Sequence, residues 1–328
     1  MAIIKSIFWN QEERRLRVLW RFFVFLMVFV PLLAGTQALI YVLAPSLVQA
    51  LNEGEGMSFL WGWTLSEWLM VGAILVALWI VGRWIDRRPF SDYGFHFGRR
   101  WWMDLLFGMV LGAVLMTGIF LSEYVLGWVT VSGSLQSPAG VSFWQGLLTV
   151  ILLFLAVGIF EELFSRGYLL HNLAEGLNFK FWNAKIALVV AWVLASLLFG
   201  VAHASNPNAT TISTINLVLA GLFLGLGYVL TGELAIPVGL HITWNFFQGN
   251  VYGFPVSGMS VNQVSFVTIE QGGPALWTGG AFGPEAGLIG NIAILVGAIL
   301  VLAWVKWRYG AIRLQERIPL PPHAETDA

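Results

Sequence analysis

The sequence predicts an all-α, polytopic membrane protein with eight transmembrane helices and both termini in the cytoplasm. Three observations lead to this prediction. Apolar residues (A, V, I, L, M, F, W, Y, C) make up 58% of the 328 residues and charged residues 11%, against about 25% charged in soluble domains. Eight apolar stretches are each long enough to cross a bilayer. Lysine and arginine fall only in or beside alternate connections between these stretches.

The eight stretches are expected to form helices, because a backbone in lipid must satisfy its hydrogen bonds within its own segment. The first stretch is too long for a signal-peptide core and lacks a clear cleavage site, so we expect it to be retained. Around the membrane domain, 18–308, we expect an interfacial N-terminal segment, 1–17, an external loop, 253–285, and a mobile tail, 309–328. The predicted spans are 18–44, 58–82, 104–128, 142–165, 184–204, 212–231, 234–252 and 286–306.

The distribution of cations predicts the orientation. Cytoplasmic loops of membrane proteins are enriched in lysine and arginine. With eight spans and cytoplasmic termini, all 17 cations lie on one side, and the connections 45–57, 129–141, 205–211 and 253–285 contain none. The cations are Lys5, Arg14, Arg15, Arg17, Arg21, Arg83, Arg87, Arg88, Arg99, Arg100, Arg166, Lys180, Lys185, Lys306, Arg308, Arg313 and Arg317.

Composition also excludes several classes of function. The 17 basic and 18 acidic residues leave a net charge of −1, so there is no basic face for nucleic acid. The chain has no cysteine, hence no disulfide, thiolate nucleophile or cysteine zinc site. The expected partner is the lipid bilayer. An integral multi-pass protein of a prokaryotic plasma membrane fits these features.

A cluster of charges near the end of the fourth span is costly in lipid and therefore a candidate functional site. Glu162 and Arg166 are four residues apart, so they lie on one helix face and can pair. Glu161 lies about 100° around the helix from Glu162 and pairs poorly with Arg166. One carboxylate is thus predicted to be structural and the other free to act. The alternative is a charge pair where the helix leaves the membrane.

Two histidines lie in apolar surroundings. His203 ends the run LLFGVAH, and His241 lies inside the seventh span with Asn245 four residues further on. A glutamate, two histidines and an asparagine on three spans form a set that can activate water. The other histidines, His96, His171 and His323, are expected to be solvated or interfacial. The acids Glu67, Asp104 and Glu123 are expected to reach an interface.

The polar residues form three motifs that occur in order. They are Glu161-Glu162-x-x-x-Arg166, Phe199-x-x-x-His203 and His241-x-x-x-Asn245. In these motifs the chain resembles the CPBP family of intramembrane proteases, which comprises the type II CAAX prenyl endopeptidases and their Abi relatives. The resemblance covers about residues 142–250, which we expect to be the protease core.

The resemblance implies an intramembrane endopeptidase and a role for each residue. Glu161 would be the general base and His203 would hold the attacking water. His241 and Asn245 would stabilise the oxyanion, while Glu162 and Arg166 would support the site. Substrates would be membrane-associated peptides or lipidated proteins, either prenylated (CAAX-type) or bacteriocin-like. A metal-free glutamate mechanism that requires no cofactor is favoured, although Glu161, His203 and His241 could also form a zinc site with an open position.

Two other functions remain as alternatives: a catalytically silent scaffold or immunity-type protein on the same fold, and a transporter with a Glu/His proton relay. The protease hypothesis requires that the three motifs meet in space. His203 lies about 28 Å along its own span, whereas a span ending at residue 165 places Glu161 at the opposite end. The helix with Glu161 must therefore extend past Phe160, as far as His171, for the motifs to meet.

Overall fold

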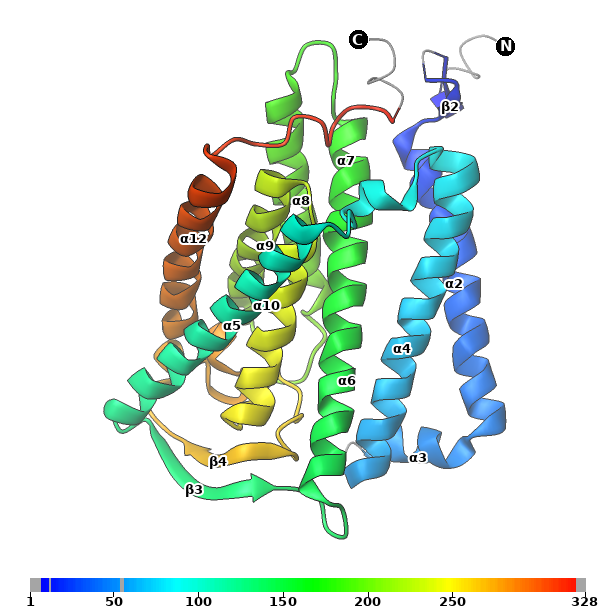
Figure 1. Ribbon diagram of the computed structural model, residues 1–328. Coiled ribbons are helices and arrows are strands. Elements are labelled where there is room, and N and C mark those ends of the chain that lie inside the picture. The colour runs from blue at the N-terminus through cyan, green and yellow to red at the C-terminus, as the bar shows by residue number, and fades with distance from the viewer. Residues whose placement is uncertain (1–6, 12, 54–55, 323–328) are drawn as a thin grey trace.

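The structure is a computed structural model that describes residues 7–11, 13–53 and 56–322. Its long helices pack side by side in one bundle, as Figure 1 shows. In the described part of the chain, seven helical segments are long and apolar enough to cross a membrane. They are Val18–Leu43 (α2), Gly56–Asp86 (α4 and the π-helical turn η1), Arg99–Val125 (α5), Phe143–Gly176 (α6, η3 and α7), Ala184–Ala202 (α8), Thr211–Thr231 (α9) and Leu288–Tyr309 (α12).

The remaining predicted span, 234–252, corresponds to an inner helix. It consists of α10, Ala235–Phe246, continued by the π-helical turn η4, Phe247–Val251. Helix α10 is almost entirely buried over its first nine residues and contacts α5, α6 and α9. In Figure 1 it runs through the bundle toward the end that carries β4. Eight membrane crossings and cytoplasmic termini stay predictions.

The helix that carries the two glutamates is longer than the predicted span, 142–165. Helix α6, Phe143–Glu162, continues without a break through the π-helical segment η3, Leu163–Leu170, into α7, His171–Gly176. The extension past Phe160 is therefore confirmed, and the predicted end at residue 165 is wrong. The charges do not end the span, because Glu162 and Arg166 pair inside the bundle and Glu161 lines an internal cavity. Glu161 lies about 27 Å from the start of this helix, at mid-height in the bundle.

Helices α5 and α10 cross in backbone contact. A Cβ atom on Gly108 would lie 2.3 Å from the Ile236 carbonyl oxygen, and one on Gly239 would lie 2.3 Å from the Leu105 carbonyl oxygen. No side chain fits at either position, so glycine alone allows this approach. The crossing holds α10 in the interior of the bundle and with it His241.

An antiparallel pair of strands closes one end of the bundle, below the helices in Figure 1. Strand β3, Val129–Gln136, pairs with β4, Ser265–Gln271, from Val129 opposite Gln271 to Gln136 opposite Ser265. The sequence did not predict this pairing, because the strands are far apart in the chain. Strand β4 lies within the predicted external loop, 253–285. The loop also contains two short helices, α11 (Ala275–Thr278) and η5 (Gly280–Phe282), and the start of a third, η6 (Pro284–Ala286).

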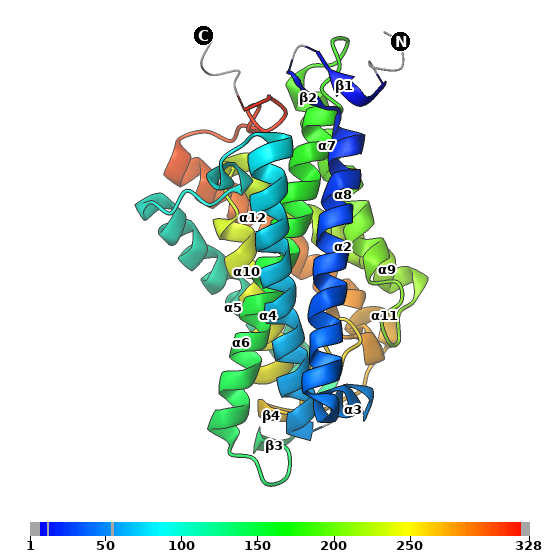
Figure 2. The same cartoon turned by 90° about the vertical axis from the view of Figure 1, so that its right-hand side faces the viewer.

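The opposite end of the bundle carries the described ends of the chain. Strands β1, Trp9–Asn10, and β2, Arg15–Leu16, pair ahead of α2, and Figure 2 shows them beside the end of α7. After α12, Gln315 donates its backbone N–H to the Val229 carbonyl oxygen (2.8 Å). This contact places Gln315 against the bundle, and a mobile tail over 309–328 stays a prediction. Residues 323–328 lie outside the described part.

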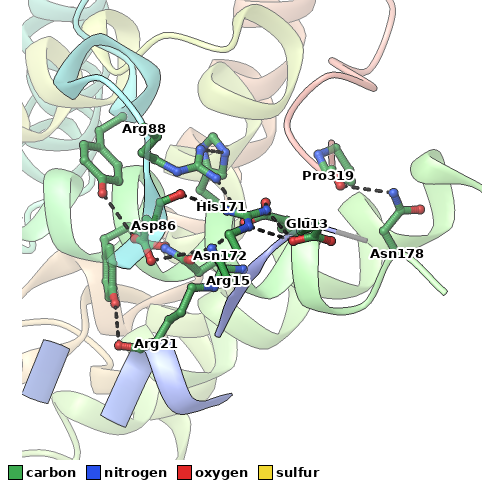
Figure 3. Close-up of polar contacts among 12 residues, drawn as sticks. Glu13, Arg15, Arg21, Asp86, Arg88, His171, Asn172, Asn178 and Pro319 are labelled. Atoms are coloured by element: carbon green, nitrogen blue, oxygen red, sulfur yellow. Dashed lines mark hydrogen bonds and ion pairs between the residues drawn. The ribbon is translucent and has the colours of Figure 1, made fainter. Parts of the chain in front are cut away.

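The same end of the bundle contains a buried ionic network, shown in Figure 3. Glu175 of α7 binds Arg15, Arg21 (2.8 Å) and Arg88 (3.0 Å). His171 is buried and contacts Arg88 and the Tyr228 hydroxyl. Of the predicted solvated or interfacial position, the solvated one is therefore wrong. We call this network the arginine cluster; its members are Arg15, Arg21, Asp86, Arg88, His171 and Glu175.

Candidate active site

The three motifs meet at one cavity in the bundle. It has a volume of about 130 Å³, which is room for several water molecules, since one needs roughly 10–15 Å³. Four predicted site residues line it: Glu161 from α6, His203 just after α8, and His241 and Asn245 from α10. Most of the remaining lining is apolar, so a charge in the cavity is only weakly screened.

Glu161 stands between the two histidines. Its Oε2 atom lies 3.8 Å from His203 Nε2 and 3.9 Å from His241 Nε2. The same oxygen has no hydrogen-bond donor among the described residues. The Glu161 side chain is 26% exposed and the His203 side chain 17%, so both can reach a ligand in the cavity. Glu161 is therefore the free carboxylate that the helix spacing predicted.

Glu162 points away from the cavity and is fully buried. Its Oε1 atom accepts hydrogen bonds from Arg166 (2.8 Å) and from His241 Nδ1 (2.7 Å). The pairing of Glu162 with Arg166 is as the spacing predicted, whereas the bond to His241 is a feature that the sequence did not reveal. This carboxylate fixes the orientation of the His241 ring, in the way that carboxylates orient histidines at metal sites.

Arg166 is held on three sides. Besides Glu162, it donates to the Gly221 carbonyl oxygen (3.0 Å) and lies 4.6 Å from the centre of the Phe199 ring. It lies in the π-helical segment η3, a type of helix often found at functional sites. The side chain is 2% exposed. Arg166 therefore supports the site from behind and does not line the cavity.

The hydrogen bonds fix the proton positions on both rings. His203 Nδ1 lies 2.8 Å from the Phe199 carbonyl oxygen, which can only accept, so Nδ1 carries the proton. A neutral His203 then presents the lone pair of Nε2 to the cavity. His241 Nδ1 donates to Glu162, so His241 can donate from Nε2 only as the imidazolium. The two histidines are thus suited to different tasks.

Other residues at the cavity come from outside the motifs. Glu67 on α4 faces the cavity and accepts a hydrogen bond from Trp63 Nε1 (3.0 Å), so the prediction that it reaches an interface is wrong. Glu285 and Ser257 come from the loop segment 253–285, and the Glu285 carboxylate accepts the Ser257 backbone N–H. No local motif marks these residues, because only the tertiary fold brings them to the cavity.

The other two acids predicted at interfaces are also buried. Asp104 accepts a hydrogen bond from Trp304 Nε1 (2.8 Å), and Glu123 accepts one from Gln271 Nε2 (3.0 Å). These contacts tie α5 to α12 and to β4. Both acids therefore stabilise helix packing away from the cavity.

The side chains that could hold a zinc ion are Glu161, His203 and His241. Among the described residues, no group of three or more histidine, aspartate or glutamate side chains is placed to hold a metal ion. Glu161, His203 and His241 converge, but their separations of 3.8 and 3.9 Å are wider than ligands about 2.0–2.2 Å from one zinc ion adopt in a tetrahedral site. The difference is only a few tenths of an ångström, so a mechanism without metal stays a prediction.

Comparison with known proteins shows which family the middle of the chain is similar to. Residues 142–247 match the family model of the Rce1-like type II CAAX prenyl endopeptidases, which confirms the resemblance carried by the three motifs. The chain is 27% identical to the uncharacterized protein YyaK of Bacillus subtilis, over 72% of this chain and 81% of that protein. It is 24% identical to an uncharacterized 24.3 kDa protein of Escherichia coli, over 58% of this chain and 79% of that protein. No solved structure matches it.

Proposed function

We propose that this protein is an intramembrane endopeptidase that uses a glutamate to activate water. The observation that carries the proposal is the convergence of Glu161 Oε2 on His203 Nε2 and His241 Nε2 in one cavity. The match to a peptidase family over residues 142–247 supports the reaction type, and the apolar helices make the protein an integral, multi-pass membrane protein.

The attacking water is held between Glu161 and His203. Both Glu161 Oε2 and the neutral His203 Nε2 are acceptors, and a water donates two hydrogen bonds. Two acceptors 3.8 Å apart can both be reached by one water about 2.8 Å from each. As the water oxygen bonds to the scissile carbonyl carbon, its proton passes to Glu161, which acts as general base.

The tetrahedral intermediate carries a negative charge on the former carbonyl oxygen. His241 donates to this oxyanion from Nε2 and Asn245 from its side-chain amide. Donors fixed in place in a dry cavity stabilise such a charge without reorganising, and Glu162 holds His241 through Nδ1 (2.7 Å). Glu161 then gives its proton to the leaving nitrogen, the C–N bond breaks, and a carboxylic acid and an amine leave.

The proposed substrates are membrane-associated peptides or lipidated proteins, either of the prenylated CAAX type or bacteriocin-like. The cavity is largely apolar, with Phe154, Val157, Leu240 and Met259 among its lining residues. Apolar side chains beside the scissile bond match such walls. No cofactor is needed for this mechanism, and retained cleavage after treatment with a zinc chelator would support that assignment.

The decisive experiment compares membranes that contain wild-type protein with membranes that contain Glu161→Gln. This change keeps the shape of the side chain and removes the base. New peptide termini, mapped by mass spectrometry, should appear with wild type and vanish with the variant, and they would name the substrate. Wild-type cleavage by Glu161→Gln would overturn the mechanism. A phenotype that survives both Glu161→Gln and His203→Ala would favour the scaffold function.

A further inference from the structure

An open groove lies on the outer face of the bundle at the end of α4. Its volume is about 660 Å³, within the range of small-molecule sites. The groove is distinct from the catalytic cavity and lies at the end of the bundle that carries the arginine cluster. Its lining residues are Leu78, Trp79, Arg83, Trp84, Arg87, Arg88, Pro89 and Phe90.

The groove is basic. Arg83 and Arg87 are exposed, and no ion pair with a described residue is found for either. No acidic residue lines the groove. The acid of the same turn, Asp86, is fully buried and faces Arg21 at 3.5 Å, as Figure 3 shows. Two positive charges therefore face outward without compensation.

The turn that presents these arginines is held rigidly from inside. Asp86 accepts a hydrogen bond from the Tyr93 hydroxyl (3.3 Å), and its backbone oxygen accepts one from Arg15 (3.1 Å). Arg88 turns inward to Glu175. Arg87 adopts a left-handed conformation with φ of 57°, which costs energy in a residue other than glycine. The groove is therefore preorganised.

Its position corresponds to the headgroup level of a bilayer. The groove lies in the last turns of the segment Gly56–Asp86, which is long enough to cross a membrane. Trp79 and Trp84 are 62% and 57% exposed and meet edge to face with ring centres 5.2 Å apart. Exposed tryptophans of this kind mark the boundary between acyl chains and headgroups.

We propose that this groove binds the headgroup of an anionic phospholipid. Guanidinium groups match phosphate oxygens with paired hydrogen bonds, so Arg83 and Arg87 contact the phosphate. The acyl chain runs along the exposed side chains of Trp79, Val76 and Leu75 toward the bilayer centre. This combination of an uncompensated cationic pair above an exposed apolar face fits a lipid better than it fits a free phosphate ion.

The test uses the purified full chain. Native mass spectrometry counts retained phosphatidylglycerol, and a thermal unfolding series compares added phosphatidylglycerol with phosphatidylcholine. Wild type should retain phosphatidylglycerol and be stabilised by it alone. In Arg83→Gln/Arg87→Gln its affinity should fall by about 10- to 30-fold, since each arginine near an anionic surface contributes roughly fivefold.

Two matched variants keep the proposal falsifiable. Arg99→Gln/Arg100→Gln removes two exposed charges from the start of α5 and should retain the lipid. Arg83→Lys/Arg87→Lys keeps the charge and should lose only a few-fold in affinity, even if the glutamine variant fails to fold. Equal loss in the Arg99/Arg100 variant, equal effects of the two lipids, or equal protection by inorganic phosphate would each overturn the proposal.

Discussion

Two buried ionic networks lie along the same continuous helix, Phe143–Gly176, and they differ in one respect. In the arginine cluster, Glu175 is surrounded by three arginines, and its side chain is 2% exposed. In the catalytic cavity, Glu161 is 26% exposed and has no donor for Oε2 among the described residues. The difference teaches that buried charge alone does not identify a functional site. An ionisable group that has no partner and faces a cavity is the better indicator of a functional site.

The largest expected effect tests the closed network. Replacing Glu175 by glutamine leaves three arginines without their shared carboxylate, and breaking a buried ion pair costs about 3–5 kcal/mol. We expect a clear fall in the unfolding temperature, with the cleavage rate of the remaining folded protein unchanged. Differential scanning fluorimetry and an activity assay normalised to folded protein measure both. A Glu175→Gln variant as stable as wild type would show that the arginine cluster does not stabilise the fold, and would contradict the difference between the two networks.

The second prediction concerns Asn245 in the open cavity. Removing one oxyanion donor typically lowers kcat by about 100- to 1,000-fold, so Asn245→Ala should lose activity on that scale. Its unfolding temperature should stay close to that of wild type, because no hydrogen bond from this side chain holds the bundle together among the described contacts. If kcat were kept and only KM changed, Asn245 would bind substrate without acting on the oxyanion.

The expected effect at Glu162 combines features of these two cases, since Glu162 is buried like Glu175 and influences the cavity through His241. In Glu162→Gln the amide still accepts hydrogen bonds but no longer favours the imidazolium form of His241. We expect kcat to fall by about 10- to 100-fold, by analogy with lost carboxylate support of a histidine. The kcat–pH profile should shift to lower pH, a change that a general loss of structure would not produce.

The smallest effect is a pH dependence of stability that originates outside the spans. Burial raises the pKa of the Glu285 carboxyl above its ordinary value of 4.5. The folded protein then keeps this proton at pH values where the unfolded chain has released it, so stability falls as the pH rises through that range. Glu285→Gln should flatten the decline of the unfolding temperature as the pH rises above the ordinary pKa of 4.5. An unchanged slope would assign the dependence to another group.

The sequence predicts the motifs of the site well and their surroundings poorly. Glu161, His203, His241 and Asn245 were predicted from residue type and spacing, because ionisable groups in apolar helices are rare and costly. Glu67 and Glu285 were not assigned to the site, since their positions depend on how α4 and the loop before α12 fold over the cavity. A lone acid in a sequence carries no information about such long-range packing.

The limits on predicting the fold have similar causes. The apolar stretches predicted the helices. The predicted span 142–165 ends eleven residues before its helix does, because Arg166 and the residues after it were interpreted as the polar end of the span. The pairing of β3 with β4 joins segments separated by four helices: the continuous helix Phe143–Gly176, α8, α9 and α10. Hydropathy detects segments that face lipid or the interior, and it does not detect which segments pair.

The length of the helix Phe143–Gly176 has a further consequence. Its 34 residues extend about 50 Å, well beyond the hydrocarbon core of about 30 Å. In a bilayer of different thickness, such a helix changes its tilt. The two ends of a rigid helix then move together. Helices α4 and α10 pack against this helix, so a change of tilt moves them together and changes the depth of Glu161 relative to the membrane surfaces.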